Sequence, residues 1–84
     1  MDPTAKWIKQ RLFAGKFRLS FHASERGDER IVSEGDIRQC GRTAKSIRFQ
    51  DDRGTWRVIG SDSDGEVLNV ICAVHEHLLI VTVF

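Results

Sequence analysis

The sequence lacks the segments that direct a chain into or across a membrane. No apolar run reaches the roughly 18 residues that a membrane span requires. The opening stretch, MDPTAKWIKQ, has no apolar core of a signal peptide. We therefore expect a cytoplasmic protein with no membrane partner. The 84 residues contain no repeat, low-complexity stretch or linker, so we expect one domain over residues 1–84.

Several signatures of catalytic and metal sites are also absent. The sequence has no glycine-rich phosphate loop, no H-E-x-x-H motif and no nucleophile elbow. Its two cysteines, Cys40 and Cys72, lie far apart and are expected to be reduced, buried thiols. Cys72, His75 and His77 form C-x2-H-x-H, but a structural zinc site needs a fourth ligand. We expect neither a metal nor a cofactor.

The charge of the chain is unevenly distributed. Residues 1–48 contain 11 Lys and Arg against 6 Asp and Glu, whereas residues 49–84 contain 2 against 6. These balances of +5 and −4 sum to the net charge of +1. The basic half would attract phosphates or an acidic partner, or it is simply the solvated surface of helices that carry lysines.

The first half of the sequence predicts helices. Asp2 and Pro3 are a favourable N-cap and first helical residue, and Gly15 is a favourable stop. Apolar residues recur between them at helical spacing, at Ala5, Ile8 and Leu12, with Trp7 and Phe13 widening the stripe. The alternating stretch KFRLSF that follows is expected to be an extended linker pinned to the core. A second helix is expected over residues 21–30, and SEGD, at 33–36, predicts a capping box for a third that ends at Cys40-Gly41.

The second half predicts strands. KSIRFQ and TWRVIG alternate with period two, and EVLNVICAV and HLLIVTVF are nearly continuous apolar runs, the first of which is expected to be a central strand. The turns DDRG and SDSDG and a longer loop near His75-Glu76 separate them. Helices followed by strands predict an α+β fold, with two or three N-terminal helices on one face of a roughly four-stranded antiparallel sheet.

A histidine and two arginines form one candidate site. His22, Arg26 and Arg30 are spaced four residues apart, so they would form one stripe on a helix. Imidazole transfers protons near neutral pH, and guanidinium binds phosphate oxygens. Together these groups provide the acid, base and cations for metal-free cleavage of RNA by its own 2′-hydroxyl. Alternatively, His22 is a packed residue at a helix start, and the arginines pair with nearby carboxylates at Glu25, Asp28 and Glu29.

The sheet offers a second set of candidates. Arg48 lies between Ile47 and Phe49, and Arg57 lies between Trp56 and Val58, so each arginine points away from its apolar neighbours. If the helices cover one face of the sheet, the other face presents Arg48, Arg57 and Thr82 to an RNA ligand. The alternative is a solvated face without a ligand.

Several segments resemble a family of small bacterial domains of unknown function, DUF4258. These segments are SFHASERGDERIVSEGDI at 20–37, WRVIG at 56–60, DGEVLNVI at 64–71 and IVTVF at 80–84. The resemblance covers roughly residues 18–84, and its motif residues correspond to His22, Arg26, Arg30, Gly60 and Thr82. The sequence departs from the pattern at Gly27 (usually methionine) and at Ile31-Val32 (usually Gly-Ile). It also departs at Asn69 (often histidine) and at Phe84 (often tyrosine), where the hydroxyl is lost.

The resemblance implies a fold similar to the RelE/ParE toxin superfamily. Many members of that superfamily are ribonucleases of type II toxin–antitoxin pairs. The resemblance therefore implies that this chain is a toxin-like domain with a cognate antitoxin as its partner. The domain would bind RNA, or cleave it without metal as an endoribonuclease of the mRNA interferase type. His22 would be the general acid/base, and Arg26 and Arg30 would bind the scissile phosphate with help from Arg57. The alternative is a non-catalytic interaction domain whose arginines bind an acidic partner or stabilise the helices.

Overall fold

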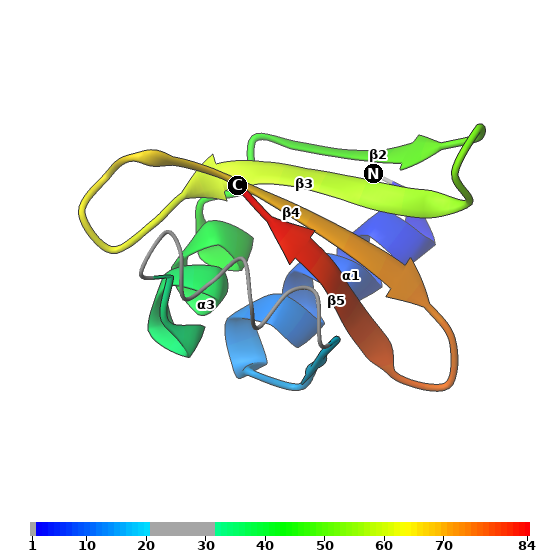
Figure 1. The fold of residues 1–84 in the computed structure, drawn as a ribbon, viewed down its shortest axis with the longest axis horizontal. Coiled ribbons are helices and arrows are strands. Elements are labelled where there is room, and N and C mark those ends of the chain that lie inside the picture. Colours follow the sequence, from blue (N-terminus) through cyan, green and yellow to red (C-terminus); the bar gives the residue numbers. More distant parts are fainter. Residues whose placement is uncertain (1, 21–31) are drawn as a thin grey trace.

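The computed structural model describes residues 2–20 and 32–84, and it has an α+β fold (Figure 1). Along the chain, the elements are α1 (Pro3–Ala14), β1 (Arg18–Leu19), α3 (Glu34–Arg42), β2 (Ser46–Gln50), β3 (Thr55–Ser61), β4 (Val67–Val74) and β5 (Leu78–Val83). The α+β class predicted from the separation of helices and strands is confirmed. Neither of the two described helices has the length and apolarity needed to cross a membrane.

The sheet contains five strands in the order β1-β5-β4-β3-β2. Strands β2 to β5 form the expected antiparallel meander, with β4 in the centre. Strand β1 adds a fifth, parallel strand at the edge, where Arg18 lies opposite Leu79 of β5. The prediction of roughly four strands, all antiparallel, is therefore wrong at β1. The segment expected to be a linker pairs with β5 instead, and Ser20 N continues the pairing by donating to Ile80 O at 2.9 Å.

Helix α1 begins and ends where the sequence predicts. The Asp2 carboxylate accepts hydrogen bonds from Thr4 N at 2.7 Å and Ala5 N at 3.4 Å, which pairs two N–H groups that the first turn leaves open. Gly15 ends the helix in the left-handed conformation with φ 74°. Phe13 does not join the buried apolar stripe as predicted, since the residue is 53% exposed.

Helix α3 begins with a complete capping box. Ser33 Oγ accepts a hydrogen bond from Asp36 N at 3.1 Å, and Asp36 Oδ2 accepts one from Ser33 N at 2.9 Å. Asp36 Oδ1 also accepts a hydrogen bond from Ser63 N in the turn between β3 and β4, at 3.0 Å. The backbone donors of Ser33 and then of Ser63 lower the pKa of Asp36 from 3.8 to about 2. The predicted helix start is confirmed, and the helix ends at Arg42, slightly beyond the predicted Cys40-Gly41.

Both described helices pack side by side on the same face of the sheet (Figure 1). The core between the layers is built from buried apolar side chains of both helices and of strands β3 to β5, at Ile8, Leu12, Ile37, Cys40, Val58, Leu68, Val70, Cys72, Leu78, Ile80 and Val83. Side chains that alternate with these along the strands point to the opposite face. That second face, which neither described helix covers, is called the open sheet face below.

Two glycines allow the layers to approach closely. A Cβ atom on Gly60 of β3 would collide with the backbone carbonyl of Cys40 on α3, and a Cβ on Gly41 would collide with Leu12 on α1. Gly60, a motif residue of the family resemblance, therefore has a packing role in this structure. The two cysteines are buried, as predicted, and burial raises the pKa of the Cys72 thiol to about 12.

Candidate nucleic-acid interface

The three residues proposed as catalytic, His22, Arg26 and Arg30, lie outside the described residues. The helix expected over residues 21–30 lies outside them as well. The candidates that the structure places are Arg48 on β2, Arg57 on β3 and Thr82 on β5. The site is therefore built here from the sheet.

Arg48, Arg57 and Thr82 lie in one row across four strands. Arg48 of β2 is directly opposite Arg57 of β3, which in turn is opposite Ile71 of β4. Ile71 is opposite Thr82 of β5. Val58, the neighbour of Arg57 along β3, is fully buried against the helices. Because successive side chains on a strand alternate between faces, the row lies on the open sheet face.

The guanidinium of Arg57 is positioned by two side chains that the sequence did not single out as site residues. Arg57 Nε donates a hydrogen bond to Asn69 Oδ1 at 3.0 Å, and its Cζ lies 5.3 Å from the centre of the Phe84 ring. Asn69 and Phe84 are themselves joined by two backbone hydrogen bonds, of 2.8 and 3.0 Å. Within the described residues no further hydrogen bond engages this guanidinium, so its terminal nitrogens can donate to a ligand.

Arg48 and Arg57 carry like charges and occupy directly opposite positions on β2 and β3. Like charges directly opposite on antiparallel strands destabilise a sheet unless an opposite charge offsets them. Among residues 2–20 and 32–84, the structure shows an ion pair between Arg53 Nε and Asp52 Oδ2, at 3.8 Å. Neither Arg48 nor Arg57 forms an ion pair with a carboxylate of these residues. A bound anion would relieve this repulsion, which is why the pair indicates an anion-binding surface.

Two hollows flank Arg57 on the open sheet face. The larger, of about 550 Å³, is lined on the sheet by Arg57, Ile71, Thr82 and Phe84, and at the β2–β3 turn by Asp52 and Arg53. The smaller, of about 390 Å³, is lined by Ser46, Arg48, Arg57 and Ile59. Arg57 thus lies between the larger hollow, which the Phe84 ring lines, and the smaller hollow, which Arg48 lines.

Thr82 lines the larger hollow, and the environment of its hydroxyl group is unusual. Its Oγ1 is buried, and in the part of the chain that the structure describes it has no hydrogen-bond partner. A buried hydroxyl without a partner costs about 1–3 kcal/mol. A buried polar group without a partner in a native protein calls for a specific explanation. Because Thr82 lines the same hollow as Arg57 and Phe84, we associate its hydroxyl with the candidate site.

Asn69 and Phe84 are the site residues that sequence reasoning missed. In the sequence they stand out only as departures from the family pattern, where histidine and tyrosine are frequent. The structure brings both departures into contact with Arg57. The sequence pattern that could have identified Asn69 as a site residue was the alternation of side chains along EVLNVICAV, because it places Asn69 and Ile71 on the same face of the strand. The register that sets Asn69 beside Phe84 was not readable from the sequence.

The structure does not bring Cys72, His75 and His77, the residues of the weak C-x2-H-x-H motif, together in a metal site. Cys72 is buried in the core, where its thiol lies 3.8 Å from the carbonyl oxygen of Trp56, whereas His75 and His77 are exposed in the loop between β4 and β5. Among the described residues, no group of three or more His, Cys, Asp and Glu side chains is placed to bind a metal ion.

Comparison with protein families matches residues 19–84 to the family described as Domain of unknown function (DUF4258). No curated protein and no solved structure matches the chain. The matched segment contains all of the open-sheet-face residues described above, and α1 precedes it.

Proposed function

Because the chain belongs to the DUF4258 family, we propose that it is a toxin-like, RNA-binding domain of a type II toxin–antitoxin pair in the bacterial cytoplasm. Two helices on one face of an antiparallel meander fit the RelE/ParE-like architecture implied by the sequence resemblance. The observation that carries the RNA-binding proposal is the Arg48–Arg57 pair, which has no carboxylate partner in the described chain and whose Arg57 guanidinium lies beside the exposed Phe84 ring.

The open sheet face provides both kinds of contact that single-stranded RNA requires. Guanidinium groups bind phosphate oxygens through paired N–H donors, and an exposed aromatic ring offers a surface on which a base stacks. Phe84 is 44% exposed, and its ring lies beside the Arg57 guanidinium. In our proposal the backbone phosphates run along Arg48 and Arg57, and a base enters the larger hollow beside Phe84.

RNA cleavage would need groups that the described residues at the centre of the open sheet face do not provide. Cleavage by the 2′-hydroxyl requires a base and an acid that exchange protons near neutral pH. Asn69, Thr82 and Phe84, the neutral side chains at the centre of this face, carry no imidazole, carboxylate or amine that could act as that base or acid. We therefore assign binding to the open sheet face and general acid/base catalysis to His22, with Arg26 and Arg30 at the scissile phosphate. Binding and cleavage should consequently be separable by mutation.

The test is expression in a bacterial host that lacks an antitoxin, followed by assays on purified protein. Growth arrest with RNA cleavage in the wild type, and loss of both in His22→Ala with unchanged circular dichroism, is the expected result. His75→Ala, at the β4–β5 loop, is the matched control and should leave both unchanged. Normal growth together with no binding of single-stranded RNA would refute the toxin proposal and favour a non-catalytic interaction domain.

A further inference from the structure

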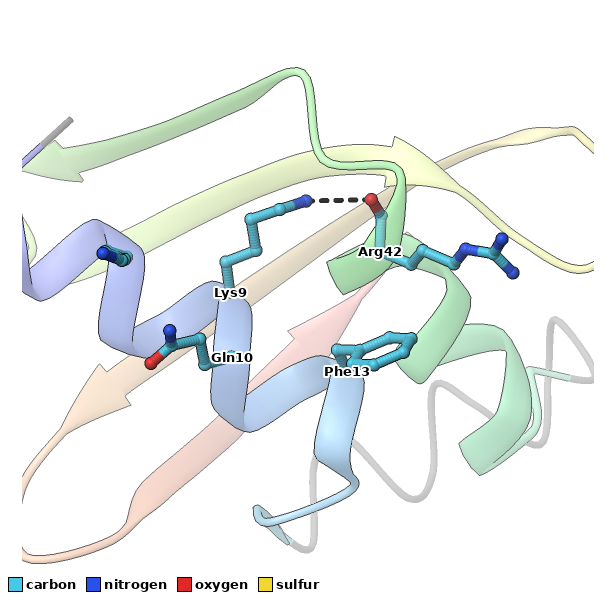
Figure 2. A pocket seen from close by; sticks show the side chains of 5 residues that line it. Lys9, Gln10, Phe13 and Arg42 are labelled. Atoms are coloured by element: carbon cyan, nitrogen blue, oxygen red, sulfur yellow. Dashed lines mark hydrogen bonds between the residues drawn. The ribbon is translucent and has the colours of Figure 1, made fainter.

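A second candidate surface lies on the other side of the molecule, between helices α1 and α3. It is a groove of about 640 Å³ lined by Lys6, Lys9, Gln10, Phe13 and Arg42, and this set is called the helical groove below (Figure 2). A smaller hollow of about 210 Å³ continues from it along α3 and adds Gly35, Arg38 and Gln39. The groove is independent of the RNA-binding proposal, because it shares no residue with the open sheet face.

Reciprocal hydrogen bonds fix the shape of the helical groove. Lys9 Nζ, on α1, donates to the carbonyl oxygens of Gly41 and Arg42 at the end of α3, at 2.7 and 2.8 Å. Figure 2 shows the extended Lys9 side chain reaching Arg42 across the groove. In return, Arg38 Nε on α3 donates to the Phe13 carbonyl oxygen at 3.1 Å, near the end of α1. Each helix thus satisfies open carbonyl groups of the other, and the groove between them is preformed.

The groove combines an apolar surface with a cationic rim. Phe13 is 53% exposed, and the aliphatic stems of Lys6, Lys9 and Arg42 continue the apolar surface of its ring. The cationic ends of Lys6 and Arg42 can extend from these stems toward solvent. Among the described residues no Asp or Glu lines the helical groove or its extension. An occupant should therefore be apolar on one side and negatively charged at its edges.

We propose that the helical groove binds an acidic amphipathic segment of a partner protein. One apolar side chain of that segment would pack on Phe13, and its carboxylates would face Lys6 and Arg42. A protein segment fits better than RNA, because the Lys9 ammonium is already bound by two carbonyl groups and contributes mainly its apolar stem. The spacing of Lys6, Lys9, Gln10 and Phe13, at i, i+3, i+4 and i+7, gives α1 a continuous face for an elongated ligand.

The test uses a fluorescein-labelled amphipathic peptide with glutamates on one helical face and leucines on the other, titrated with the full chain. We expect saturable binding, weakened at least about fivefold by Phe13→Ser and by Arg42→Gln. Phe49→Ser is the matched control for the aromatic ring, because Phe49 is 49% exposed but lies on β2. Arg57→Gln is the matched control for charge, and it also separates this proposal from RNA binding. Both controls should bind the peptide within about twofold of the wild type.

Three outcomes would overturn the proposal. The first is an absence of saturable peptide binding by folded wild-type protein. The second is equal loss in the groove variants and their controls, which would indicate non-specific attraction to a basic surface. The third is evidence that the groove binds another ligand. In that case Phe13→Ser and Arg42→Gln would leave peptide binding unchanged but weaken RNA binding, or weaken self-association as measured by analytical ultracentrifugation.

Discussion

The Nε atom of Arg57 donates a hydrogen bond of 3.0 Å to Oδ1 of Asn69, across the pairing of strands β3 and β4. This bond and the Phe84 ring together orient a guanidinium on the open sheet face. An oriented guanidinium loses less side-chain freedom on binding a phosphate than a mobile one would. The relationship therefore supports Arg57 as the central contact of the proposed RNA interface.

Neutralising either arginine of the opposed pair should weaken RNA binding. For Arg57→Gln and Arg48→Gln we expect the affinity for a single-stranded RNA oligonucleotide to fall about tenfold, because each variant removes one cation that binds a phosphate. The slope of log K against log salt should become shallower by about 0.7 in each variant. Fluorescence anisotropy over a salt series measures both quantities. Arg42→Gln, on the helical groove, is the control, and an equal effect there would contradict a specific role of the open sheet face.

Replacing Thr82 by valine should separate stability from binding. The variant keeps the shape of the side chain and removes a buried hydroxyl that lacks a partner among the described residues. We therefore expect the free energy of unfolding in urea to stay the same or to rise by up to about 1 kcal/mol. If the hydroxyl contributes to the RNA site, affinity should fall although stability does not. A clear loss of stability would show that the hydroxyl has a structural partner after all.

The stability of the chain should depend on Asp36 at low pH. Hydrogen bonds in the folded state lower the pKa of this carboxyl from 3.8 to about 2. A lowered folded-state pKa stabilises the protein above pH 3.8, and that contribution disappears as the pH falls through about 2.

Asp36→Asn should accordingly cost about 1 kcal/mol at neutral pH, through loss of the capping box and of the hydrogen bond from Ser63. The difference in unfolding free energy from the wild type should shrink as the pH approaches 2, as measured by urea titrations at several pH values. Asp64→Asn, at an exposed turn position, is the control. A difference between wild type and Asp36→Asn that stays constant with pH would contradict this assignment.

Adding a methyl group at Gly60 should force the layers apart. The new Cβ would collide with the Cys40 carbonyl on α3, and backbone atoms cannot move aside as a flexible side chain can. We expect Gly60→Ala to lower the free energy of unfolding by about 1–3 kcal/mol. Gly35→Ala is the control, because a Cβ there meets Ser33 Oγ at an ordinary 3.5 Å, and alanine favours the helix by up to about 1 kcal/mol. Thermal denaturation of both variants distinguishes the two effects.

Local features of the fold were predictable because neighbouring residues encode them. Asp2, Pro3 and Gly15 bound α1 through capping chemistry that needs no distant partner. The capping box at Ser33–Asp36 was predicted in the same way. Strands β2 and β3 followed from side-chain alternation, and β4 and β5 followed from nearly continuous apolar runs. Phe13 was misplaced because helical spacing puts it near the core stripe, whereas the position of α3 decides which side of α1 is covered.

The parallel strand β1 and the composition of the candidate site depend on contacts between distant residues. Residues 18–19 lie in an alternating stretch that predicted an extended linker, and they become a strand because the edge of β5 pairs with their backbone. Likewise, the sequence set Arg57 on the side of β3 away from the core, but the register of β4 and β5 chose Asn69 and Phe84 as its neighbours.

The amino-acid sequence by itself therefore determined the α+β class, the caps of α1 and α3 and the antiparallel succession of β2 to β5, because these follow from short-range periodicity and capping. The tertiary structure decided the strand register, the pairing of Arg48 with Arg57 and the groove between α1 and α3. Those features arise where segments far apart in the chain pack together, and no local pattern specifies that packing.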